Sequence, residues 1–149
     1  MKPKEQERPL RFKQIVDYKL IPQDLILQLE GAEWTVEKFS LIQEALKNDP
    51  NNLLFGLVEA KDKKDKLVGF CWAQCDELKK AIFIHGLSID VKYQDGNILP
   101  FTKRFFDYLI RKSNGMLEQV YWITERAKAY EKYGFFKSKY CLMCLYKEA

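Results

Sequence analysis

Residues 87–98 combine residue types and a spacing that could hold a phosphate group. An apolar strand pattern ends there in a short polar turn, and an amphipathic segment follows from Ile98; the turn residues are Gln94, Asp95, Gly96 and Asn97. A strand that turns tightly into a helix leaves the first backbone N–H groups of the helix unpaired, and together with the helix dipole these groups bind phosphate. Asp, Gly and Asn are also the commonest turn formers, so a plain strand-to-helix turn is the alternative interpretation.

His85 is the single histidine of the chain and lies in the same apolar strand pattern. A neutral imidazole near pH 7 is well suited to accept a proton from an ammonium group, directly or through a water molecule. By strand alternation His85 shares a face with Phe83. A hydrogen-bonded histidine of the core is the alternative, and Asp76 and Glu77, at the hairpin before the strand, are weaker candidates for a base.

The cysteine spacing resembles two zinc half-sites, but the surrounding sequence argues against a metal. The four residues are Cys71, Cys75, Cys141 and Cys144. Zinc-binding cysteines lie on tight turns, whereas both pairs here lie inside continuous apolar strand patterns, where a cysteine is usually a small buried hydrophobe. We expect reduced structural thiols and no metal site.

The composition predicts one soluble domain over residues 1–149. The chain is 47% apolar and 14% aromatic, which suffices for a core built from a sheet and helices. No apolar run reaches the roughly 18 residues that a membrane span needs. Residues 1–9 are rich in charge and have no apolar stretch, so we expect a frayed tail rather than a signal peptide. These features predict a cytoplasmic protein.

The charge pattern does not favour nucleic-acid binding. The net charge of +4 comes from 25 basic and 21 acidic residues that are interspersed along most of the sequence. A nucleic-acid-binding surface would show as a clustered basic stripe. The densest charge run, residues 61–66, lies between two apolar strand patterns and predicts a solvated hairpin tip.

Hydrophobic periodicity predicts a mixed α/β fold. Strand patterns occupy residues 10–16, 53–60, 67–75, 81–90, 116–124 and 136–146. Helical spacing indicates a short helix opened by Pro22, a second helix capped by Thr35, and two more over residues 97–112 and 125–132. Short connections make strands two to four an antiparallel meander, and the strand-helix-strand crossover makes strands four and five parallel. Both strand faces are apolar, so helices should cover both sides of the sheet.

This order of elements resembles the GNAT superfamily of acyl-coenzyme A dependent N-acyltransferases over about residues 10–146. Residues 90–99 are similar to the motif A of the family, a strand followed by a Gln/Arg-x-x-Gly-x-Gly/Ala loop. Residues 127–135 are similar to motif B, which ends in Tyr-x-x-x-Gly-Phe. The resemblance implies a mixed, mostly antiparallel central sheet of six to seven strands, flanked by about four helices, with strands four and five parallel and splayed apart.

The resemblance also implies where coenzyme A would bind. In the family the motif A loop wraps the pyrophosphate with backbone amides, and the backbone of strand four pairs with the pantetheine arm. Carried onto this chain, the pantetheine contacts fall on Leu87 and Ile89. The loop positions fall on Gln94, Asp95, Gly96, Asn97, Ile98 and Leu99, with Asn97 and Leu99 at the two positions where the family has small residues.

Tyr130 matches the family tyrosine that usually lies near the thioester sulfur and protonates the departing thiolate. The alternative is a packing aromatic at the end of a helix. Family members often place a carboxylate base on strand four, where the best match is Phe83. His85 is therefore the candidate base in this chain.

Two function classes follow from this sequence. The first is an enzyme that uses acetyl-CoA, or another acyl-CoA, to acylate a primary amine of a small molecule or a protein. The second is a non-catalytic module of the same fold that acts through protein–protein interaction, including as a homodimer through its last strands. The first two helices and the strand-end loops would select the acceptor, and they carry no motif.

Overall fold

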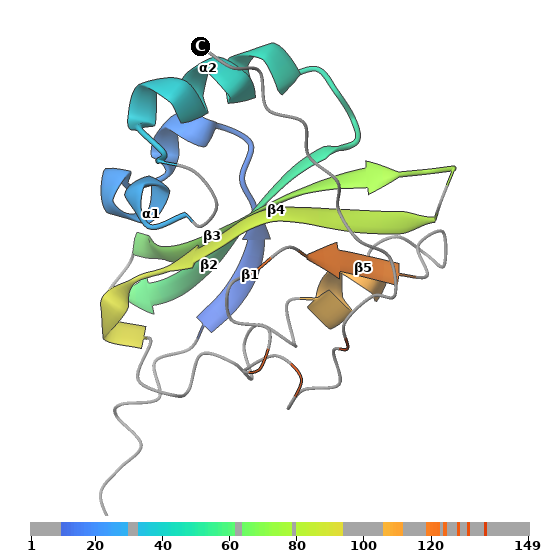
Figure 1. The fold of residues 1–149 in the computed structure, drawn as a ribbon. Coiled ribbons are helices and arrows are strands. Elements are labelled where there is room, and N and C mark those ends of the chain that lie inside the picture. Colours follow the sequence, from blue (N-terminus) through green and yellow to red (C-terminus); the bar gives the residue numbers. More distant parts are fainter. Residues whose placement is uncertain are drawn as a thin grey trace, which may run out of the picture.

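The structure, a computed structural model, describes residues 10–29, 33–61, 64–78, 80–93, 106–111 and 119–122, with single positions at 124, 128, 131 and 136. These residues form a five-stranded sheet in the order β1-β2-β3-β4-β5 (Figure 1). The strands are β1 Leu10–Gln14, β2 Asn52–Lys61, β3 Lys64–Asp76, β4 Ala81–Ile89 and β5 Gln119–Trp122. The helices are η1 Tyr18–Leu20, α1 Gln23–Leu27, α2 Val36–Leu46 and η2 Val91–Tyr93, and residues 106–111 are also helical.

The sheet topology confirms the predicted meander and the predicted parallel pair. Strands β1 to β4 pair antiparallel with their neighbours in sequence. Strand β5 pairs parallel with β4, as a crossover connection of this length requires. The charged run at residues 61–66 lies where β2 turns into β3, with Lys61 opposite Lys64.

Helix α2 begins where the sequence predicts. The backbone of Thr35 is extended, and its hydroxyl oxygen accepts a hydrogen bond from the Lys38 backbone N–H at 3.0 Å, which satisfies one of the free donors of the first turn. Phe39 and Gln43 are the fully buried residues of the helix, one turn apart on the same face. That face packs onto the sheet, and Phe39 lies 5.7 Å from the ring of Phe70 on β3.

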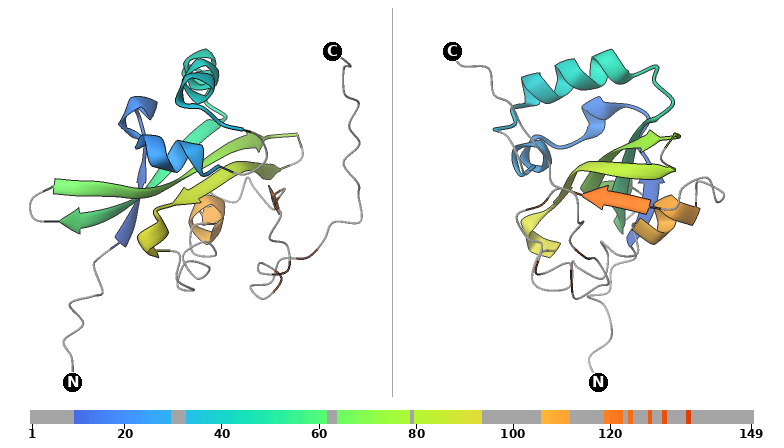
Figure 2. Two further views of the ribbon diagram at one scale, coloured as in Figure 1. Left: turned by 60° about the vertical axis from the view of Figure 1, so that its left-hand side comes forward. Right: turned by 45° about the vertical axis from the view of Figure 1, so that its right-hand side comes forward.

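Helices cover both faces of the sheet, as the apolar strands predict (Figure 2). Helices α1 and α2 pack on one face, where Phe39, Phe70 and Trp72 belong to one buried cluster. The helical residues 106–111 pack on the other face, where Phe106 and Leu109 join a second cluster with strand residues. These residues lie within the helix predicted over residues 97–112, and both Phe106 and Leu109 are buried.

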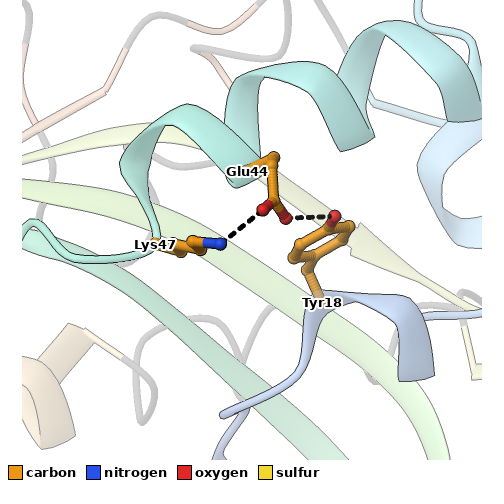
Figure 3. Close-up of polar contacts among 3 residues, drawn as sticks. All are labelled: Tyr18, Glu44 and Lys47. Atoms are coloured by element: carbon orange, nitrogen blue, oxygen red, sulfur yellow. Dashed lines mark hydrogen bonds and ion pairs between the residues drawn. The ribbon is translucent and has the colours of Figure 1, made fainter.

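Segment η1 is tied to the last turn of α2 by three polar side chains (Figure 3). The Tyr18 hydroxyl donates to a Glu44 carboxylate oxygen at 2.8 Å, and the Lys47 ammonium group donates to the other oxygen. These hydrogen bonds lower the pKa of Glu44, and the bond to Glu44 raises the pKa of Tyr18. All three groups lie at the surface, so they orient the segment rather than add much stability.

Several predictions from the sequence concern residues outside the described part. Residues 137–146 of the expected final strand are among them, and the described Phe136 lies in no strand. The described sheet has five strands where the family resemblance implied six to seven. Cys141 and Cys144 also lie outside it. Cys71 and Cys75 lie in β3 as predicted, and burial raises the pKa of both thiols. None of the helices in the described part is long and apolar enough to cross a membrane.

Candidate functional site

Strand β4 keeps β5 as a neighbour for only the first part of its length. The parallel register pairs Ala81 to Ile84 with Gln119 to Trp122, whereas β4 continues to Ile89. Figure 1 shows β5 beside the first part of β4 only. Within the described residues, the pairing of the two strands therefore ends at Ile84.

A β-bulge lies directly after this last described pair. Across β3 and β4, Ala73 pairs with Ile84 and Trp72 pairs with Gly86, so His85 has no register partner of its own on β3. An extra residue of this kind bends the bulged strand and increases its twist. The bulge therefore bends β4 at the single histidine of the chain.

The bulge also changes which side chains share a face of the sheet. The rings of Phe83 and His85 lie 5.0 Å apart, which confirms the predicted shared face. A Cβ atom on Gly86 would meet the Leu29 side chain at 2.6 Å, so Gly86 faces the same side, toward α1. Regular alternation would send residues 85 and 86 to opposite faces. Glycine at position 86 lets α1 approach β4 closely beside His85.

Backbone polar groups of β4 alternate between its two neighbours. The Asp90 N–H donates to the Val68 carbonyl at 2.7 Å, so the residue after β4 still bonds toward β3. In an antiparallel ladder the bonding direction alternates with every residue. Ser88 therefore points its backbone groups toward β3, whereas Leu87 and Ile89 point theirs away from β3, to the edge on which β5 pairs with the first part of β4.

His85 is a half-buried, neutral imidazole with one defined polar contact. Its Nε2 lies 2.8 Å from Oε1 of Gln74, on β3. Burial lowers the pKa of His85 below its ordinary value, because a charged imidazolium loses hydration there. At neutral pH the ring is therefore uncharged, which is the state that a proton acceptor needs.

The ring plane of His85 is set by an aromatic neighbour. The indole of Trp72 lies against it, with ring centroids 4.6 Å apart and planes inclined by 33°. The indole N–H donates to Oδ1 of Asn52 at 2.7 Å, and Nδ2 of Asn52 donates to Oε1 of Gln43 at 3.0 Å. Because an indole nitrogen can only donate, the Trp72 contact fixes the orientation of both amides. A polar chain from α2 thus holds the aromatic surface beneath the imidazole.

His85 and Gln74 line a cleft of about 500 Å³ at the end of the β3–β4 hairpin. The titratable side chains around it are His85, Cys75, Asp76 and Glu77, and the remaining lining residues are Asn51, Leu78 and Phe83. The nearby charge of Glu77 adds to the rise in the Cys75 pKa. The cleft therefore offers a neutral base, an aromatic ring and two carboxyl groups.

The structure locates only part of the predicted site. His85, Leu87 and Ile89 lie together on β4 from the bulge onward. Predicted site residues outside the described part are Gln94, Asp95, Gly96, Asn97, Ile98, Leu99 and Tyr130.

Sequence reasoning missed Gln74, Trp72 and Asn52. The available signal was a polar glutamine inside the apolar pattern of β3.

Comparison with known proteins gives matches among solved structures. No family model and no curated protein matches the sequence. A possible acetyltransferase from Clostridium difficile 630 superposes with a TM-score of 0.69 at 14% identity, covering 94% of this chain and 98% of the other. AAC(6')-Iy in complex with the bisubstrate analog CoA-S-monomethyl-acetylneamine gives 0.63 at 11% identity, covering 95% and 99%.

A third match is the ribosomal-protein-S18-alanine N-acetyltransferase from Escherichia coli. Its TM-score is 0.60 at 16% identity, and the superposition covers 88% of this chain and 80% of the other. The protein has the GNAT fold. The superpositions confirm the resemblance at the level of the fold. They do not by themselves test motif A and motif B.

Proposed function

We propose that this protein is an N-acyltransferase that moves an acyl group, acetyl in the simplest case, from coenzyme A to a primary amine. The observation that carries the proposal is the position of His85 on β4, directly after the last described pair with β5 and in one cleft with Gln74. It puts a neutral base beside the strand to which the resemblance assigns coenzyme A. Both the donor and the acceptor of an acyl transfer must meet at such a place.

The edge of β4 fits the pantetheine arm of coenzyme A. The register directs the backbone N–H and C=O of Leu87 away from β3, to the edge on which β5 pairs with the first part of β4. A pantetheine arm carries amide groups that can pair with a strand in the way a neighbouring strand would. Ile89 is the second contact that the resemblance implies. The turn from Gln94 to Leu99 would hold the pyrophosphate through its backbone amides.

His85 fits the role of general base. The ammonium group of the acceptor gives one proton to the neutral imidazole of His85, directly or through one water molecule. The neutral amine nitrogen then attacks the thioester carbonyl carbon, and the carbon–sulfur bond breaks. Tyr130 gives a proton to the departing thiolate, and the second proton that the nitrogen loses replaces it.

The cleft beside His85 fits an amine acceptor. Asp76 and Glu77 give it carboxyl groups, and the lining residues that the structure describes include no lysine or arginine. An aliphatic amine is an ammonium ion at neutral pH and is attracted to such a surface. Neighbours with the GNAT fold include proteins named for acetylation of an aminoglycoside and of a ribosomal protein, so the fold admits acceptors of both classes.

The test is a titration of the purified protein with coenzyme A and acetyl-CoA. A ligand at about 100 times its Kd stabilises the folded state by about 2.7 kcal/mol, which raises Tm by several degrees in a domain of this size. Calorimetry gives the affinity, and release of free thiol in the presence of a panel of primary amines reports turnover. No rise in Tm and no heat of binding at millimolar ligand would overturn the proposal.

A further inference from the structure

The cleft beside the bulge contains a polar pair whose role goes beyond the base itself. The side-chain oxygen of Gln74 lies 2.8 Å from Nε2 of His85, and both residues line the same cleft. The two side chains come from neighbouring strands, β3 and β4, on either side of the bulge. An imidazole has two ring nitrogens, and only one of them can face Gln74. The contact with the glutamine therefore makes the two nitrogens different.

A neutral imidazole carries one N–H donor and one acceptor nitrogen. In the amide orientation that the structure shows, the oxygen of Gln74 faces the ring and can only accept, so the ring nitrogen that faces it is the protonated one. The partner of one ring nitrogen thereby decides which nitrogen is free to act. Here the partner assigns the proton to Nε2 and leaves the lone pair on Nδ1.

We infer that Gln74 is a positioning residue that selects the Nε2–H tautomer of His85 and so makes Nδ1 the atom that accepts the proton of the acceptor amine. The role of Nδ1 rests on the proposed function, whereas the tautomer does not. Trp72 supports the arrangement by packing against the ring at 4.6 Å. The ring is thus held by a hydrogen bond at one nitrogen and by stacking on its plane.

The choice of a neutral partner matters for the charge of the ring. The titratable groups that line the cleft with His85 are Cys75, Asp76 and Glu77, and desolvation is the cause of the lowered His85 pKa. Glutamine satisfies Nε2–H without adding a negative charge. A carboxylate in its place would favour the imidazolium form, which cannot accept a proton.

The single histidine makes the tautomer directly measurable. Nitrogen-15 NMR of the imidazole, on protein without a histidine tag at a pH above the His85 pKa, distinguishes protonated from unprotonated ring nitrogens. We expect Nε2 to be protonated and Nδ1 unprotonated in the wild type. In Gln74→Leu the two tautomers should approach the mixture found in free histidine. The matched control is Gln14→Leu, an exposed glutamine on β1 at the far side of the sheet, which should keep the wild-type spectrum.

A second variant keeps the size of the side chain and changes its charge. Gln74→Glu should raise the pKa of His85 by about one to three pH units, because an opposite charge at hydrogen-bond distance stabilises the imidazolium. A wild-type spectrum with Nδ1 protonated, or tautomer ratios equal in the wild type and Gln74→Leu, would overturn the inference. An unchanged His85 pKa in a folded Gln74→Glu protein would also overturn it.

The activity of the same variants separates this inference from the proposed function. Gln74→Leu should lower kcat with coenzyme A affinity unchanged, and Gln74→Glu should move the acidic limb of the pH profile upward. The NMR result stands without any turnover. If the tautomer is as inferred and coenzyme A does not bind, the proposed function fails and the role of Gln74 in setting the ring remains.

Discussion

The imidazole of His85 lies against the indole of Trp72, although the two residues are not partners in the strand register. Trp72 pairs with Gly86, and the next pair along joins Ala73 to Ile84. Because of the bulge, His85 has no partner in the β3–β4 register. Its imidazole packs against the indole of Trp72, with ring centroids 4.6 Å apart. A tilted contact at this distance is a favourable aromatic arrangement. It joins the packed core of the α1/α2 face to the candidate base.

The polar chain beneath this contact should be important for stability. Asn52→Ala removes the acceptor of the Trp72 indole N–H and the donor to Gln43, whose side chains are 5% and 1% exposed. Leaving buried polar groups without partners costs about 1–3 kcal/mol each. We expect a fall of that order in the free energy of unfolding, measured with urea. The control Asn48→Ala, at an exposed position after α2, should change the free energy of unfolding by less than about 0.5 kcal/mol. Equal effects of the two substitutions would contradict a stabilising role of the Trp72–Asn52–Gln43 hydrogen bonds.

The close approach of α1 to β4 can be tested at Gly86. A Cβ atom there would lie 2.6 Å from Cδ2 of Leu29, and Leu29 is buried. Gly86→Ala should therefore destabilise the fold by about 1–3 kcal/mol, as overpacking usually does. Combining it with Leu29→Ala should cost less than the sum of the two single changes, because the smaller side chain makes room. Strict additivity in the urea unfolding energies would argue against this contact.

The stability of the protein should depend on the titration of His85. Its pKa is lowered in the folded state, so between that pKa and the unfolded value of about 6.5 the unfolded chain binds more protons. Stability should therefore fall as pH drops through this window and should be fully present above it. In His85→Gln this part of the pH dependence should vanish, as measured by unfolding at a series of pH values. A wild-type curve unchanged by the substitution would contradict the assignment.

The proposed acid can be tested apart from cofactor binding. Tyr130→Phe should lower kcat by about 10²-fold or more, the usual contribution of a positioned proton donor. The Kd for coenzyme A should stay within about twofold, because the hydroxyl acts on the leaving sulfur. Tyr18→Phe is the control, since that hydroxyl bonds to Glu44 between η1 and α2. Full turnover in Tyr130→Phe would contradict the proposed role of Tyr130, because another group would then protonate the thiolate.

Local patterns in the sequence sufficed for most of the fold. Thr35 predicts the start of α2, and the charge run at residues 61–66 predicts the end of a hairpin. The short connections between strands predict the antiparallel meander. These features depend on neighbours in sequence, so composition and spacing reveal them. The parallel β4–β5 pair follows from the length and handedness of the crossover.

The sequence by itself determined the order of the elements, the fold class and the position of the one histidine on β4. Only the tertiary structure decided that β4 bulges at His85 and that Gln74 and Trp72 hold the imidazole. These contacts join residues on different strands, and a shift of register by one residue would exchange the faces of a strand. The alternating pattern fixes which residues are buried, whereas the register between strands fixes which side chains meet.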